Sequence, residues 1–108
     1  MSAEGWTPIC RYDRLVPERG VAALVAGRQV AIFRTHDGSL YGLDNFDPLC
    51  GANVLARGIV GTRGDLPTVA SPMHKQVYDL TSGRCLDATD VTVRTYSVRC
   101  CDGVVEVR

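Results

Sequence analysis

This chain of 108 residues lacks several sequence features by which large classes of proteins are recognised. Lysine plus arginine and aspartate plus glutamate number 12 each, so the basic excess of a nucleic-acid-binding protein is absent. The longest apolar run extends only from Val21 to Ala26, far short of the ~20 residues that span a bilayer. Residues 1–6 show no secretory signal pattern. We therefore expect a soluble cytoplasmic protein that contacts neither nucleic acid nor membrane.

The cysteines lack the spacing of a metal or redox motif. Their number, five, is odd, and no two of them form a Cys-x-x-Cys pair. Cys100 and Cys101 are adjacent, so in a strand they would point to opposite faces and could not readily bind one ion together. In a cytoplasmic protein we expect free and mostly buried thiols, with a structural disulfide or a redox role as the alternatives.

Motifs of enzymatic catalysis are missing as well. The sequence contains no evident Ser/His/Asp or Cys/His arrangement and no pair of carboxylates placed for acid–base chemistry. The glycines between Gly51 and Gly64 follow none of the phosphate-binding patterns. His36 stands one residue before a turn and is expected to be exposed. We therefore expect no active site on this chain alone.

Short β-branched segments are what the sequence does contain. Turn signals separate them roughly every eight to twelve residues, a pattern typical of a β-sandwich or barrel. Residues 21–26 and 29–35 are predicted to pair as a hairpin about Gly27-Arg28, and residues 40–44 to return after the Asp37-Gly38 turn. The sequence thus predicts one antiparallel all-β domain over residues 1–108.

The second half of the chain continues this pattern with one long connection. Residues 46–65 are predicted to form a functional loop with a brief strand at Ile59-Val60. A further hairpin is expected between residues 76–80 and 84–86. We expect residues 91–101 to form one continuous strand, which the Asp102-Gly103 turn connects to residues 104–107.

Two proline-bearing loops, Asn45–Leu49 and Ala70–His74, stand on this predicted scaffold. A Rieske [2Fe–2S] centre is held by two cysteines and two histidines, which come from a Cys-x-His loop and a Cys-x-x-His loop. The chain resembles such a domain in the segments Gly38–Asn45, Val54–Gly61, Ala70–Cys85, Tyr96–Val98 and Asp102–Val107. The resemblance implies a Rieske-like ferredoxin fold, with a loop-rich cluster-type subdomain at residues 46–83 inserted in the β-scaffold.

Within that family the chain is most similar to the small subunit of assimilatory NAD(P)H-dependent nitrite reductase. The residues that carry this similarity are Asp44–Pro48, Val54–Gly58 and Ala70–Gln76. The resemblance implies a non-catalytic cytoplasmic subunit of an oxidoreductase of nitrate assimilation, which reduces nitrite to ammonium with NADH or NADPH. It also implies a large-subunit partner that carries FAD, sirohaem and a [4Fe–4S] cluster.

Most of the cluster ligands of the family are replaced in this sequence. The Cys-x-His positions fall on Asp47 to Leu49 or, shifted by one residue, on Pro48 to Cys50; the Cys-x-x-His positions fall on Ser71 to His74. Only His74 stands at a ligand position, because leucine has no donor atom and iron–sulfur chemistry selects thiolates over serine. Asp47, before a proline, is expected to form a turn. We therefore expect no [2Fe–2S] cluster, other cofactor or metal on this chain.

The degenerate loops leave alternatives open. Their apolar side chains would either plug the space of a cluster or form a surface that contacts the large subunit. The candidate residues of this surface are Phe46, Leu49, Met73 and His74. The alternative functions are a stand-alone Rieske-type ferredoxin with non-standard ligands and a binding module that borrowed the fold. A zinc site of Cys50, His74 and Cys85 is a further alternative, although their spacing is not paired.

Overall fold

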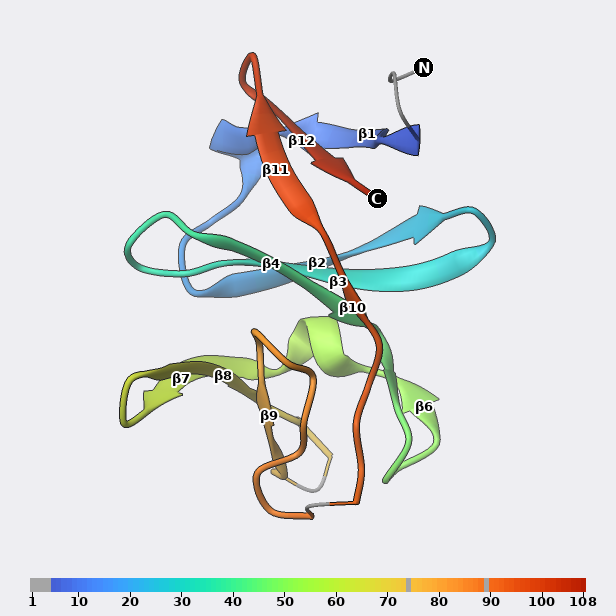
Figure 1. Cartoon of the computed structure of the whole chain (residues 1–108), viewed down its shortest axis with the longest axis vertical. Coiled ribbons are helices and arrows are strands. Elements are labelled where there is room, and N and C mark those ends of the chain that lie inside the picture. The colour runs from blue at the N-terminus through green and yellow to red at the C-terminus, as the bar shows by residue number, and fades with distance from the viewer. Residues whose placement is uncertain (1–4, 74, 89) are drawn as a thin grey trace.

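The computed structural model describes residues 5–73, 75–88 and 90–108. Its strands form four antiparallel sheets, and α-helix is absent from the described part of the chain. In Figure 1 a three-stranded sheet lies at the top, the four-stranded sheet lies below it, and the loop-rich half lies at the bottom. No helix within the described residues is long and apolar enough to cross a membrane. The predicted all-β architecture is confirmed.

The first sheet joins the two ends of the chain. Strand β12 (Val104–Val107) lies between β1 (Thr7–Arg11) and β11 (Val98–Cys101), so the opening strand pairs with the last one. The predicted closing hairpin is confirmed, and Asp102 and Gly103 at its turn both have positive φ, as a two-residue hairpin turn of this kind requires.

The second sheet has the order β10-β4-β3-β2 and forms the middle layer. Its strands are β2 (Arg19–Val25), β3 (Arg28–Arg34), β4 (Leu40–Asp44) and β10 (Thr95–Tyr96). Both faces of β3 are covered: Val30 and Ile32 pack in a core with the first sheet, whereas Ala31 and Phe33 pack in a core with the lower half. This explains why β3 is a continuous apolar run rather than an alternating one.

The predicted continuous strand over residues 91–101 is wrong. Strand β10 pairs with β4, β11 pairs with β12, and Thr92 makes an isolated bridge with Arg84. Figure 1 shows this segment rising from the lower half past the middle sheet to the first one, so it changes partners on the way. An alternating β pattern cannot reveal such a change, because the side-chain period is the same beside every partner.

The lower half contains two small sheets and a 3₁₀ helix. Strands β5 (Phe46–Asp47) and β6 (Ala52–Asn53) form one sheet, and β7, β8 and β9 form the other. The bounds of these three strands are Ile59–Arg63, Leu66–Ala70 and Val77–Asp79. The brief strand predicted at Ile59-Val60 is therefore the start of a hairpin, and the connection before it is shorter than expected. Outside the lower half, another 3₁₀ helix, η2 (Tyr12–Arg14), directly follows β1.

Asn45 fixes the lower half to the middle sheet. This buried side chain accepts a hydrogen bond from the Ala56 amide at 2.7 Å and donates one to Gln29 at 3.1 Å. Ala56 belongs to the 3₁₀ helix η3 (Leu55–Arg57), whose Leu55 is fully buried in the lower core. The first proline-bearing loop thus leaves the scaffold from an anchored residue.

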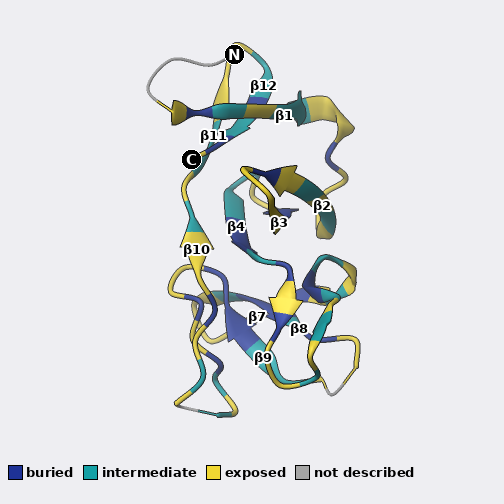
Figure 2. Ribbon diagram, turned by 90° about the vertical axis from the view of Figure 1, so that its right-hand side faces the viewer, coloured by how far each residue is buried: buried dark blue, intermediate teal, exposed yellow. Residues whose placement is uncertain are grey.

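The cysteines are free, as expected, but the expectation that most of them are buried is wrong. Only Cys85 is buried; Cys10 and Cys50 are partly exposed, and Cys100 and Cys101 are exposed. The last two lie at the end of β11 beside the closing turn, where no further sheet covers them. Figure 2 shows buried stretches in strands of the middle sheet and of the lower half, with exposed residues mainly in the connections.

Candidate functional site

The two proline-bearing loops meet through two side chains. Asp47 ends β5 and Ser71 directly follows β8, and the Ser71 hydroxyl donates a hydrogen bond of 2.5 Å to Asp47 Oδ2. Both residues are buried. Each is the first residue of its degenerate motif, so this contact favours the alignment that places Asp47 and Ser71 at the two cysteine positions over the one shifted by one residue.

A third side chain, from the strand after the second loop, completes the connection. The Tyr78 hydroxyl, on β9, donates a hydrogen bond of 2.7 Å to Asp47 Oδ1, which also accepts one from the Leu49 amide at 3.0 Å. Tyr78 is fully buried. We call Asp47, Ser71 and Tyr78 the Asp47 network. The predicted turn-forming role of Asp47 is confirmed by the bond to Leu49.

Sequence reasoning missed the Asp47 network. It treated Asp47 as a turn former and Ser71 as a lost ligand, and it assigned no role to Tyr78. The one signal available was a polar aromatic residue in the strand that follows the second loop. A buried tyrosine needs a partner for its hydroxyl, and the loops are the nearest source of acceptors.

Electrostatics in the network favour an ionised Asp47. Burial opposes its charge, but hydrogen bonds from Ser71, Tyr78 and the Leu49 amide outweigh burial and hold the pKa of Asp47 below its ordinary value. Burial and the hydrogen bond to the Asp47 carboxylate raise the pKa of Tyr78 far above its ordinary value. The network is therefore one carboxylate anion held by neutral hydroxyl donors and an amide.

The residues at the cluster positions do not fit a Rieske centre. Asp47 and Ser71 are hydrogen-bonded to each other, and Leu49 offers no donor atom. A Rieske cluster requires two thiolates and two imidazoles, and oxygen ligands suit other metals. Predicted residue His74 lies outside the described residues. Among residues 5–73, 75–88 and 90–108, no group of three or more His, Cys, Asp or Glu side chains could hold a metal ion.

The apolar residues of the loops lie on the surface of this end of the molecule. Phe46 is 45% exposed, Leu49 37% and Met73 59%. The buried Asp47 network lies between the loops, whereas these three apolar side chains are exposed, which argues against the alternative in which they plug the space of a cluster. We call Phe46, Leu49 and Met73 the apolar tip.

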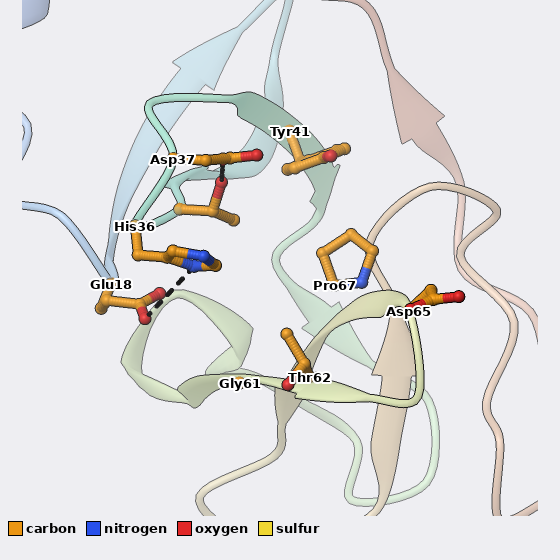
Figure 3. Close-up of a pocket in the computed structure, with 9 residues that line it drawn as sticks. Glu18, His36, Asp37, Tyr41, Gly61, Thr62, Asp65 and Pro67 are labelled. Carbon is orange, nitrogen blue, oxygen red and sulfur yellow. Dashed lines mark hydrogen bonds and ion pairs between the residues drawn. The ribbon is translucent and has the colours of Figure 1, made fainter.

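A hollow of about 130 Å³ lies between the β3–β4 turn and the β7–β8 hairpin (Figure 3). Glu18 and His36 lie on one side of it and Thr62 and Asp65 on the other (Figure 3). His36 is exposed, as predicted, and its Nδ1 lies 3.9 Å from Glu18 Oε1.

Local contacts account for Asp37 in this hollow. Hydrogen bonds from the Thr35 hydroxyl and from the Ser39 amide lower the pKa of Asp37 to about 2. Its carboxylate thus stabilises its own turn. This hollow brings together no set of groups with an evident chemistry.

Comparison with known proteins gives the chain its family. Residues 5–108 match the model of the Rieske-like [2Fe–2S] domain. The small subunit of the NADH nitrite reductase of Escherichia coli K12 is 39% identical over 104 residues, which are 95% of this chain and 96% of that protein. A crystal structure from Mycobacterium tuberculosis, assigned as an NADH-dependent nitrite reductase small subunit, has 47% identity and a TM-score of 0.92, with 94% of this chain and 92% of that chain covered.

A region of a longer protein is similar as well. The large subunit of the NAD(P)H nitrite reductase of Klebsiella oxytoca is 40% identical over 102 residues, which are 94% of this chain but 11% of that protein. The family model and the similar crystal structure agree with the fold described above. This chain therefore belongs to the Rieske-like family and, within it, to the small subunits of NAD(P)H-dependent nitrite reductase.

Proposed function

We propose that the chain is a non-catalytic, cytoplasmic small subunit of nitrite reductase, which reduces nitrite to ammonium with NADH or NADPH in nitrate assimilation. The observation that carries this proposal is the replacement of cluster ligands by the Asp47 network within a small-subunit fold. Reduction of nitrite needs centres that accept and pass on electrons. In this proposal the large subunit supplies them as FAD, sirohaem and a [4Fe–4S] cluster, and this chain binds no [2Fe–2S] cluster or other cofactor.

The apolar tip is the proposed contact with the large subunit. Its three exposed apolar side chains come from two loops that the Asp47 network holds together, and such patches are typical of interfaces. The Klebsiella oxytoca large subunit supports the pairing, because a region similar to this chain lies within its own polypeptide. Fusion of two units in one chain is expected where both act in one assembly.

Co-expression with the large subunit of the same organism tests the contact. The double substitution Phe46→Asp and Met73→Asp places two charges on the apolar tip and should abolish co-purification, because a desolvated unpaired charge is strongly unfavourable. Leu66→Asp, at the far end of β8 from Ser71 and 38% exposed in the wild type, is the matched control and should bind normally. Undiminished binding of a folded double variant would contradict the docking proposal.

Iron analysis of the isolated chain tests the cofactor proposal and separates it from the alternative of a stand-alone ferredoxin. The proposal predicts a colourless protein without stoichiometric iron, after expression with an active iron–sulfur assembly system. A brown protein with near-stoichiometric iron and acid-labile sulfide would establish the ferredoxin instead. A parallel chelator treatment should leave the unfolding midpoint unchanged, whereas a cluster-stabilised fold would be weakened.

A further inference from the structure

The outer edge of β2 presents unpaired backbone groups. Strand β2 has β3 on one side and no strand on the other within the described part of the chain. The Gln29 carbonyl accepts a hydrogen bond from the Asn45 amide, on the β4 side of β3, and Gln29 pairs in register with Leu24. Because the direction of backbone groups alternates along antiparallel strands, Gly20, Ala22 and Leu24 direct their N–H and C=O groups away from β3.

This edge lacks the usual protection against pairing. From Gly20 to Val25 the strand has no charge, no proline and no bulge, and Leu24 is 70% exposed. Strand β1, another sheet edge, is different: it carries Pro8, and its pairing with β12 shifts register between Pro8 and Cys10. Proteins commonly protect exposed edges by such means, so the unprotected six residues after Arg19 indicate a surface that pairs.

Two hollows follow one another along β2. Beside residues 18–20, residues 56–59 wall a hollow of about 540 Å³. Beside residues 21–24, residues 8–10 of β1 wall a second one of about 440 Å³. Figure 2 shows β1 in the layer above that of β2. Ile59, in the first hollow, is 75% exposed, so apolar surface lies along both.

The charge around these hollows is mainly positive. Arg14, Arg19 and Arg57 line them, and Glu18 is the one carboxylate that does so among the described residues. Glu18 itself lies 3.9 Å from His36. A second copy of the chain would bring the same arginines against each other, whereas a segment with acidic side chains would complement them.

We propose that the outer edge of β2 binds an extended segment of a partner protein with alternating apolar and acidic side chains, which extends the four-stranded sheet by one strand. Main-chain hydrogen bonds to Gly20, Ala22 and Leu24 supply affinity, as in other cases of strand addition. The two hollows lie on opposite faces of the sheet, one toward β1 and one toward the lower half. Apolar side chains of the segment, all on one face, enter the hollow beside β1, and its acidic side chains, on the other face, lie toward Arg19 and Arg57. This surface is distinct from the apolar tip and does not depend on the proposed contact there.

Titration of the ¹⁵N-labelled chain with a synthetic peptide of alternating valine and glutamate tests the proposal. We expect saturable shifts at the amides of Gly20, Ala22 and Leu24 and slower hydrogen exchange there. Ala22→Pro removes an outward N–H that β3 does not use, and an edge strand tolerates proline at such a position. It should weaken peptide binding about tenfold, since it removes one hydrogen bond and obstructs the next. The matched control, a valine–lysine peptide, should not bind.

Arg19→Glu provides a second variant that leaves the backbone unchanged. It reverses one exposed charge and should weaken binding of the glutamate peptide even if Ala22→Pro fails to fold. The proposal is overturned if those three amides show no shift up to about 1 mM peptide. It is also overturned if the lysine peptide binds equally well, or if the chain dimerises through β2 and Ala22→Pro abolishes that dimer.

Discussion

Replacing Asp47 by asparagine tests the network that stands at the former cluster position. The substitution removes the negative charge and keeps the size of the side chain. In the wild type the carboxylate accepts hydrogen bonds from Ser71 at 2.5 Å, Tyr78 at 2.7 Å and the Leu49 amide at 3.0 Å. Hydrogen bonds to a charged group contribute about 1.5–3 kcal/mol and neutral ones about 0.5–1.5 kcal/mol, so the two bonds to Oδ1 should each weaken by about 1 kcal/mol. The amide nitrogen that replaces Oδ2 donates and cannot accept, so the bond with Ser71 must reverse its direction.

The net change is smaller than the sum of these losses. Burial disfavours the charged form of Asp47, and asparagine avoids that penalty. We therefore expect Asp47→Asn to lower the free energy of unfolding by about 1–2 kcal/mol at about pH 7. Asp47→Ala should cost more, about 3–5 kcal/mol, because it leaves the buried hydroxyls of Ser71 and Tyr78 without their acceptor.

The pH dependence of the free energy of unfolding separates the effect of the Asp47 charge from the effect of its side-chain shape. The pKa of Asp47 is lower in the folded protein than its unfolded value of about 3.9, so its charge stabilises the fold above that value. This contribution to stability is lost as the pH falls through the pKa that Asp47 has in the folded protein, and Asp47→Asn lacks the contribution at every pH. The difference between wild type and Asp47→Asn should thus be constant from about pH 5 to 8 and shrink below about pH 4. Asp79 and Asp87, whose pKa values are also lowered, titrate in both proteins and cancel.

Urea unfolding at about pH 7 and about pH 3, followed by Trp6 fluorescence and far-UV circular dichroism, measures this difference. Trp6 stacks with Arg99 in the first sheet, far along the chain from the substitution, so it reports global unfolding. Asp65→Asn, in an exposed turn, is the matched control and should change stability by less than about 0.5 kcal/mol. An Asp47→Asn loss below that level at neutral pH, or one equally large at both pH values, would refute the reasoning.

Two further predictions follow from the lower half. Gly83→Ala should lower the free energy of unfolding by at least about 3 kcal/mol in urea titrations, because φ is +79° there and an added Cβ would lie 2.1 Å from a backbone carbonyl oxygen. The combined substitutions Asp47→Cys, Leu49→His and Ser71→Cys, together with the existing His74, should allow a [2Fe–2S] cluster to form, as read from iron, sulfide and visible absorption. A folded triple variant that takes up no iron would contradict the alignment of the two loops.

The fold could be predicted largely from sequence because its signals are local. Hairpins such as the one closed by Asp102-Gly103 show their turn residues and their alternating strands within a few positions. The segment from Val91 to Cys101 could not be assigned correctly, since its path past two sheets depends on which edges are open. Edge availability is a property of the assembled layers, and no residue in the segment encodes it alone.

The candidate site could be predicted only in part. The replacement of cluster ligands could be predicted, because the prediction needs only the residue type at each motif position. The Asp47 network could not be predicted, because its members lie far apart in the sequence. Ser71, directly after β8, is 24 positions from Asp47, and Tyr78, in β9, is 31 positions from it. Contact between such residues depends on the pairing of β8 with β9 and on the depth at which each loop is buried. Tyr78 in particular has the sequence pattern of an ordinary core residue.

The Asp47 network connects stability to the shape of the apolar tip. The Leu49 amide donates to Asp47, and the Met73 amide lies 3.4 Å from the Ser71 hydroxyl, to which it donates. Two of the three tip residues are therefore held by the main chain to the side chains that replace the cysteines. A cluster in this family would connect the same two loops through metal–sulfur bonds. A buried carboxylate connects them here through hydrogen bonds, and its need for several donors keeps both loops in one arrangement.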